Sequence, residues 1–165
     1  MSVPKGRRGL SDFEFYHTAR QLREDMTNLL LRDFGVKDSV RKTYEVDGKQ
    51  VTVVEEYPHW IIEGFRASII RLLRELILNI TAGNSIYPTT PEELSERRRF
   101  QTASIINCEQ LQQELIYCAD ILPLKISTVA PFAGRIETEV KLLKGWRKSN
   151  KKLFQGSSPG PPGLE

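Results

Sequence analysis

Four segments of this chain repeat apolar side chains at alternating spacings of three and four residues. That spacing places the side chains on one face of an α-helix. The segments are residues 15–29, 62–80, 94–122 and 132–143. Each apolar face must be buried against another, and a length of 165 residues suits a single domain. The sequence therefore predicts an all-α, up-down-up-down four-helix bundle.

Local signals indicate where the first and third helices begin. Ser11 and Glu14 form a capping box, which predicts that the first helix begins at Ser11. Gly35 fits its C-terminal cap. Thr90 followed by Pro91 predicts an N-cap and the first residue of the third helix.

The two ends of the chain lack helical periodicity. Residues 1–10 are basic and predicted to be flexible, and residues 155–165 are rich in Pro, Gly and Ser and predicted to be disordered. The bundle is therefore expected over residues 11–154. Its second helix starts near Pro58, and its fourth runs from about Pro131 to the end of the bundle.

Residues from about 36 to 57 differ in kind from the helical segments. Residues 43–46 and 51–54 are β-prone, and Asp47-Gly48 between them favours a tight turn. We expect a small β-hairpin inserted between the first and second helices. A lone two-stranded ribbon is marginally stable, so the hairpin should lean on the bundle or on a neighbouring subunit.

Composition argues against several function classes. Cys108 and Cys118 both lie on an apolar face, which predicts buried free thiols in a reducing cytosol, and no secretory signal or membrane span is evident. His17 and His59 have no partner at metal-ligand spacing, so neither a metal nor a cofactor is expected. No phosphate loop, nucleophile elbow or other catalytic constellation appears. The sequence therefore predicts a cytoplasmic protein that is not an enzyme.

Positive charge is concentrated at the two ends. The net charge of +3 combines basic stretches in residues 1–10 and 141–152, which hold no acid, with a mildly acidic remainder. Such asymmetry favours a polyanionic partner. In the second stretch the bases recur at helical spacing beside Trp146. They are Lys141, Lys144, Arg147, Lys148, Lys151 and Lys152.

This cationic row has two interpretations. Cations on one helix face with an aromatic neighbour suit phosphate contact and base stacking. Alternatively the lysines neutralise the C-terminal end of a helix dipole, and Trp146 fills the core or a subunit contact. Arg97, Arg98 and Arg99 are similarly open, because surface pairing such as Glu93 with Arg97 competes with a role in binding.

One family shares this pattern. Four helices, a basic surface and a fourth helix ending in residues 142–150 (LLKGWRKSN), with residues 108–115 (CEQLQQEL) as weaker support, resemble the accessory variability determinant (Avd) proteins of diversity-generating retroelements. The resemblance covers residues 11–154. It implies a non-catalytic homopentamer that binds the reverse transcriptase and template RNA or cDNA, and supports mutagenic reverse transcription.

By that resemblance, the six bases of residues 141–152 would contact nucleic acid, joined by Arg98 and Arg99 on a neighbouring helix. The hairpin departs from the compact members of the family. A different function also fits the charge pattern: a protein-interaction module that docks an acidic protein and does not touch nucleic acid.

Overall fold

The computed structural model describes residues 9–32, 36 and 39–157. Within these ranges the chain is mostly helical, with four long helices and a two-stranded antiparallel hairpin between the first and second of them, as predicted. The elements are η2 (Leu10–Asp12), α1 (Glu14–Leu31), β1 (Ser39–Val46), β2 (Lys49–Glu56), α2 (His59–Ser85), α3 (Pro91–Ile121), α4 (Ile126–Lys148) and α5 (Asn150–Ser157).

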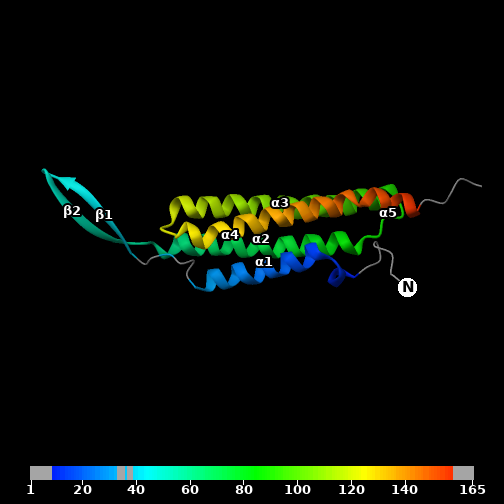
Figure 1. Cartoon of the computed structure of the whole chain (residues 1–165), viewed down its shortest axis with the longest axis horizontal. Helices are drawn as coiled ribbons and strands as arrows, with labels where there is room; N and C mark the ends of the chain where they lie inside the picture. The colour runs from blue at the N-terminus through cyan, green and yellow to red at the C-terminus, as the bar shows by residue number, and fades with distance from the viewer. Residues whose placement is uncertain (1–8, 33–35, 37–38, 158–165) are drawn as a thin grey trace, which may run out of the picture.

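The long helices α1 to α4 lie side by side and run in alternating directions (Figure 1). α1 contacts α2 and α4, and α3 contacts the same two helices. We call α1–α4 with α5 the helical body. Its core is apolar and runs along the length of the helices, with Leu22, Ile69, Leu73, Ile136 and Leu143 almost fully buried. The predicted apolar faces therefore form the core, since burial removes them from water.

The start of α1 differs from the prediction. Ser11 lies in η2, and α1 begins at Glu14 with Phe13 at the N-cap. The capping-box prediction is therefore wrong. Phe13 enters the helix in an extended conformation, and its ring lies 5.0 Å from that of Phe15, so aromatic packing fixes this entry. Gly35, the predicted C-cap, lies outside the described residues.

The start of α3 is as predicted. The hydroxyl of Thr90 accepts the backbone N–H of Glu93 at 3.2 Å, and Pro91 is the first helical residue. At α2, Pro58 is the N-cap, close to its predicted place. Both starts follow from local chemistry. Thr90 accepts a backbone N–H of the first turn, and the prolines have no N–H that would need a partner.

The fourth helix begins earlier than predicted. α4 starts at Ile126 and includes Pro131 in its interior. A proline here removes one hydrogen bond near the helix start. The added turn buries Val129 to 5% exposure, which offsets that loss. At its other end α4 stops at Lys148, and α5 continues the path to Ser157, so the expected single helix is interrupted at Ser149.

The hairpin projects from one end of the helical body (Figure 1). Asp47 and Gly48 have φ of 53° and 73°, so they form the predicted tight turn, and Val46 faces Lys49 across it. The strands are longer than the two β-prone runs. Every residue from Arg41 to Glu56 is exposed, so the helical body does not support the hairpin as one expectation had it.

Among the described residues, the root of the hairpin is where it is tied to the helices. The hydroxyl of Tyr57 donates to the backbone carbonyl of Ile121, and the side chains of Val36 and Tyr57 pack partly against the core. None of the described helices has the length and apolar character needed to cross a membrane.

Candidate nucleic-acid interface

A basic groove runs between the first turns of α3 and the end of the α4–α5 path. Its volume is about 850 Å³. Pro91, Leu94, Ser95 and Arg98 of α3 form one side. The other side consists of Lys141, Lys144, Gly145, Arg147, Lys148, Asn150 and Lys151.

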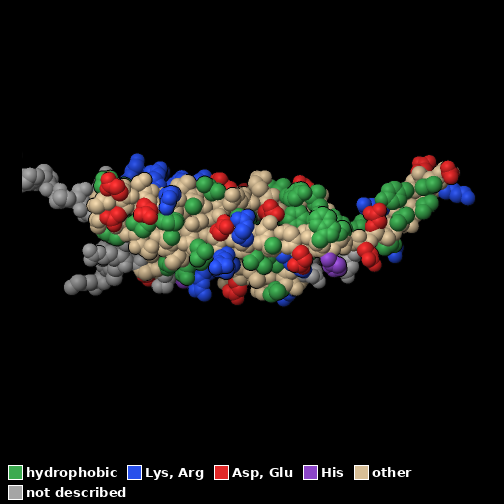
Figure 2. Space-filling model, turned by 180° about the vertical axis from the view of Figure 1, so that it is seen from behind, with side chains coloured by type: hydrophobic (Ala, Val, Ile, Leu, Met, Phe, Trp, Pro, Cys, Tyr) green, Lys and Arg blue, Asp and Glu red, His purple; other side chains and the backbone are tan. Residues whose placement is uncertain are grey.

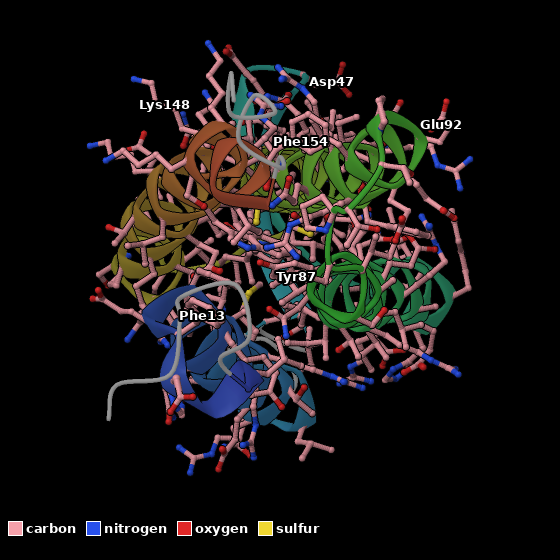
Figure 3. All side chains as sticks on the ribbon, turned by 90° about the vertical axis from the view of Figure 1, so that its right-hand side faces the viewer. Phe13, Asp47, Tyr87, Glu92, Lys148 and Phe154 are labelled. Atoms are coloured by element: carbon pink, nitrogen blue, oxygen red, sulfur yellow. The ribbon has the colours of Figure 1, made fainter. Side chains whose placement is uncertain are left out.

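The groove brings together six of the eight predicted binding residues: Arg98, Lys141, Lys144, Arg147, Lys148 and Lys151. Lys152 and Arg99 do not line it. Lys152 is exposed on α5, and the guanidinium of Arg99 lies over the ring of Phe100 at 5.3 Å. Figure 3 looks along the helices from the α5 end, where Lys148 points away from the helical body.

Nothing in the groove neutralises these charges. Its lining holds no carboxylate, and the groove lysines form no ion pair with a carboxylate in the part of the chain that the structure describes. By contrast, Arg135 in the first half of α4 pairs with Asp25 at 2.8 Å. A concave surface of one sign attracts ions of the other sign.

One groove cation is held in place. A terminal nitrogen (Nη1) of Arg147 donates to the hydroxyl of Thr102 on α3 at 3.1 Å. The side chain is half-buried, whereas Lys144, Lys148 and Lys151 are exposed. Arg147 therefore lines the groove with a side chain whose planar guanidinium is tied to α3, and the lysines present mobile point charges.

Trp146 belongs to the core. It is 5% exposed and stacks on Phe15 with ring centroids 4.4 Å apart. The guanidinium of Arg97 lies over its ring at 5.5 Å. The interpretation of Trp146 as a core residue is therefore confirmed, and a role in stacking on bases is wrong because no ligand can reach its ring.

Arg97 is buried, at 2% exposure. Its Nη1 donates to the backbone carbonyls of Gly83 at 3.1 Å and Ile86 at 2.7 Å. The interpretation of Arg97 as a surface partner of Glu93 is therefore wrong. The carbonyls stand at the C-terminal end of α2, where the helix dipole favours a cation, and desolvation lowers the pKa of Arg97 from its ordinary value.

The same network holds α5 against α3. Arg97 Nε donates to Asn150 Oδ1 at 3.1 Å. Gln101 and Asn150 exchange two amide hydrogen bonds, Gln101 Nε2 to Asn150 Oδ1 at 3.1 Å and Asn150 Nδ2 to Gln101 Oε1 at 2.5 Å. A buried polar group costs free energy unless it is paired, so this network fixes one arrangement. It thereby fixes where the α5 lysines stand relative to Arg98.

Sequence reasoning missed these polar core residues, although a signal existed. The apolar pattern of the third helix lapses between Leu94 and Ile105. Arg97, Gln101 and Ser104 continue its spacing of three and four across the gap, and all three are buried. Each of these polar residues occupies a core position and has a hydrogen-bond partner there.

Glu139 was missed in the same way. It is 1% exposed, at a stripe position between Ile136 and Leu143. The hydroxyl of Thr18 donates to its Oε2, and its Oε1 has no hydrogen-bond partner among the described residues. Burial raises the pKa of Glu139 to about 7, although the Thr18 hydrogen bond opposes the shift.

The Cys108 thiol interacts electrostatically with Glu139. Burial raises the pKa of the Cys108 thiol, with a smaller contribution from Glu139, so this thiol is a poor nucleophile. Cys108 and Cys118 are both buried and free, as predicted. Within the described ranges no group of three or more His, Cys, Asp and Glu side chains could hold a metal ion.

No protein-family model, curated protein or solved structure matches this chain. The site is therefore characterised by its own geometry. A groove with six cations, no carboxylate in its lining and one fixed guanidinium can bind a polyanion by charge.

Proposed function

We propose that this protein binds nucleic acid through the basic groove and acts as a non-catalytic accessory protein in reverse transcription. The observation that carries the proposal is the convergence of Arg98 on α3 with five cations of α4 and α5 around one groove whose lining holds no carboxylate. Phosphate backbones bind such surfaces through release of their counterions.

The retroelement assignment rests on the resemblance of residues 142–150 to Avd proteins. The proposal includes an up-down-up-down four-helix bundle, which the alternating directions of α1 to α4 support (Figure 1). It also includes a homopentamer in the cytoplasm, with the reverse transcriptase and template RNA or cDNA as partners. Light scattering tests the pentamer, whose mass would be five times the 18.9 kDa of one chain.

The main test reverses charge inside and outside the groove. One variant carries Lys144→Glu, Lys148→Glu and Lys151→Glu. Its matched control carries Lys49→Glu, Arg74→Glu and Lys125→Glu, which are exposed positions away from the groove and give the same change in net charge. Binding of labelled template RNA is measured by fluorescence anisotropy between 50 and 200 mM salt, a range over which phosphate-dependent affinities fall by orders of magnitude.

The groove variant should lose RNA binding, and its plot of log affinity against log salt should become shallower by about two, since each lost contact to a single-strand phosphate removes roughly 0.7 from the slope. The control should bind nearly as the wild type does. Equal losses in the two variants, or binding without salt dependence, would contradict the proposal. Capture of an acidic protein after nuclease treatment, with no affinity for RNA or DNA, would support the protein-docking function instead.

Association with the reverse transcriptase needs its own experiment. The tagged chain is co-expressed with the reverse transcriptase encoded next to it, if there is one, and the complex is purified with and without nuclease. A complex that survives nuclease, and cDNA synthesis that depends on this chain, support the accessory role. An isolated gene with no neighbouring reverse transcriptase contradicts it.

A further inference from the structure

We propose that the basic groove accepts an unpaired nucleotide, so that the protein prefers single-stranded nucleic acid to duplex. This inference rests on the proposed function and adds a ligand class. In it, a base lies against Leu94 and Gly145 between the guanidinium groups of Arg98 and Arg147, and the neighbouring phosphates lie on the lysines.

The first argument is the chemistry of the lining. Binding by charge alone would need only the lysines and arginines of the groove. The groove also has an apolar part, which is formed by Pro91, the half-buried Leu94 and the backbone at Gly145. Its volume of about 850 Å³ lies within the range of small-molecule sites. A base in a duplex is stacked and paired, whereas an unpaired base can enter a groove and pack on its lining.

The second argument is the glycine itself. A glycine inside a helix costs about 1 kcal/mol relative to alanine. At Gly83 packing requires it, because an added Cβ would lie 2.9 Å from Cη2 of Trp146. At Gly145 an added Cβ would meet nothing within 4 Å. Packing therefore does not demand Gly145, just as it does not demand Gly64 or Gly134. Gly145 differs from these two because it lines the groove, where a side chain would take up space.

The third argument is the pair of arginines. Arg98 comes from α3 and Arg147 from α4, and the hydrogen bond to Thr102 holds the Arg147 guanidinium in the groove wall. Guanidinium planes stack on unpaired bases. Lysine ammonium groups, which are compact point charges, suit the phosphates. The two cation types thus divide the recognition of base and backbone.

The one amide side chain in the groove lining, that of Asn150, is not free to read base identity. Both of its amide atoms are bound to Arg97 and Gln101 in the buried network. Recognition through stacking and charge tolerates any base. We therefore expect a preference for unpaired over paired nucleotides, with little dependence on sequence.

The test fills the groove without changing its charge. Gly145→Leu places a side chain in the groove, and Gly145→Ala places a smaller one. Gly134→Leu is the matched control, since Gly134 is an exposed glycine of the same helix, outside the groove, where an added Cβ also meets nothing within 4 Å. Thermal unfolding checks that all three variants fold, as expected for good helix formers at open positions.

Anisotropy titrations use a 12-nucleotide oligo(U), the matching oligo(dU) and a blunt RNA duplex of the same length. The wild type should bind at least one single strand about tenfold more tightly than the duplex, the gain expected from stacking a base. Gly145→Leu should remove that preference and keep the salt dependence, while Gly134→Leu should match the wild type. Comparing the two single strands reports whether the ribose 2′-hydroxyl contributes.

Two results would overturn the inference alone. In the first, the wild type binds single strands and duplex equally. In the second, Gly145→Leu leaves single-strand binding unchanged, or it weakens the binding of single strands and of duplex by the same factor. In both cases the salt-dependent affinity of the proposed function would remain. If the wild type binds no probe at low salt, the proposed function fails and this inference fails with it.

Discussion

The two ends of the helical body are built on different principles. At the α5 end, Arg97, Gln101 and Asn150 are buried in a polar network, and the cations around the groove stand outside it. At the hairpin end the buried residues are apolar, and large apolar side chains are left exposed. These include Leu31, Trp60, Tyr117, Ile121 and Ile126. Figure 2 shows hydrophobic side chains gathered on the body beside the hairpin and along it.

This difference shows two ways to position a surface. The helices that carry the groove cations are held together by the hydrogen bonds among Arg97, Gln101 and Asn150, so the backbone that forms the groove has a defined geometry. The hairpin is placed by its root, where Tyr57 contacts Ile121, and its strands pack on none of the described helices closely. Burial of polar groups therefore specifies position at one end, and chain connectivity does so at the other.

The largest expected effect tests the network. Arg97→Ala leaves the partly buried Ile86 carbonyl without its side-chain donor and removes one of the two donors from the Gly83 carbonyl and from Asn150 Oδ1. We expect a loss of about 3 kcal/mol in the free energy of unfolding, since buried groups lose their partners. Urea denaturation measures it, with the exposed Arg99→Ala as control. A change below about 0.5 kcal/mol, typical of surface sites, would mean that the network does not order this end.

The next effect concerns pH. Glu139 has a pKa of about 7 in the folded protein, above the ordinary 4.5, so the folded state holds a proton that the unfolded state has released between these values. The stability that this proton contributes is therefore fully present below about pH 4.5 and is lost as pH rises through 7. Glu139→Gln should raise the free energy of unfolding by about 2 kcal/mol at pH 8, and it should change that free energy little at pH 4.5. The exposed Glu137→Gln is the control, and equal pH profiles for wild type and Glu139→Gln would contradict the assignment.

A third prediction contrasts two glycines. Gly83→Ala should destabilise the protein by about 1–2 kcal/mol, because the new methyl group collides with the Trp146 ring in a packed core. Gly145→Ala should stabilise it by up to about 1 kcal/mol, because the added methyl group has space and alanine favours the helix. Differential scanning calorimetry compares the two variants. A fall in melting temperature for Gly145→Ala would show that the groove glycine is also held by packing.

The smallest effect is expected at the hairpin. Val51→Thr with Val53→Thr changes two exposed side chains on one side of the ribbon. Because they pack on no helix, the unfolding free energy of the helical body should change by less than about 0.5 kcal/mol. Helical circular dichroism followed against urea measures this. A loss comparable to that of Arg97→Ala would erase the contrast between the two ends.

Much of the fold could be predicted from the sequence. The apolar faces, the Thr90 cap and the Asp47-Gly48 turn were all found, because each is encoded by residues close together in the chain. The errors share a cause. The start of α1, the start of α4 before Pro131 and the burial of Arg97 depend on packing between elements, which local patterns do not report. Packing of Phe13 and Val129 outweighs the capping and proline signals there.

For the candidate site, the sequence determined which residues share a helical face, since that follows from 3.6 residues per turn. It thereby placed the lysines of residues 141–151 in one row. Only the tertiary structure decided that Arg98 faces this row and that Arg97 lies beneath it, bonded to a residue 53 positions away. The reason is physical. Side-chain periodicity is a property of one helix, whereas burying a charge requires partners that only the folded chain brings together.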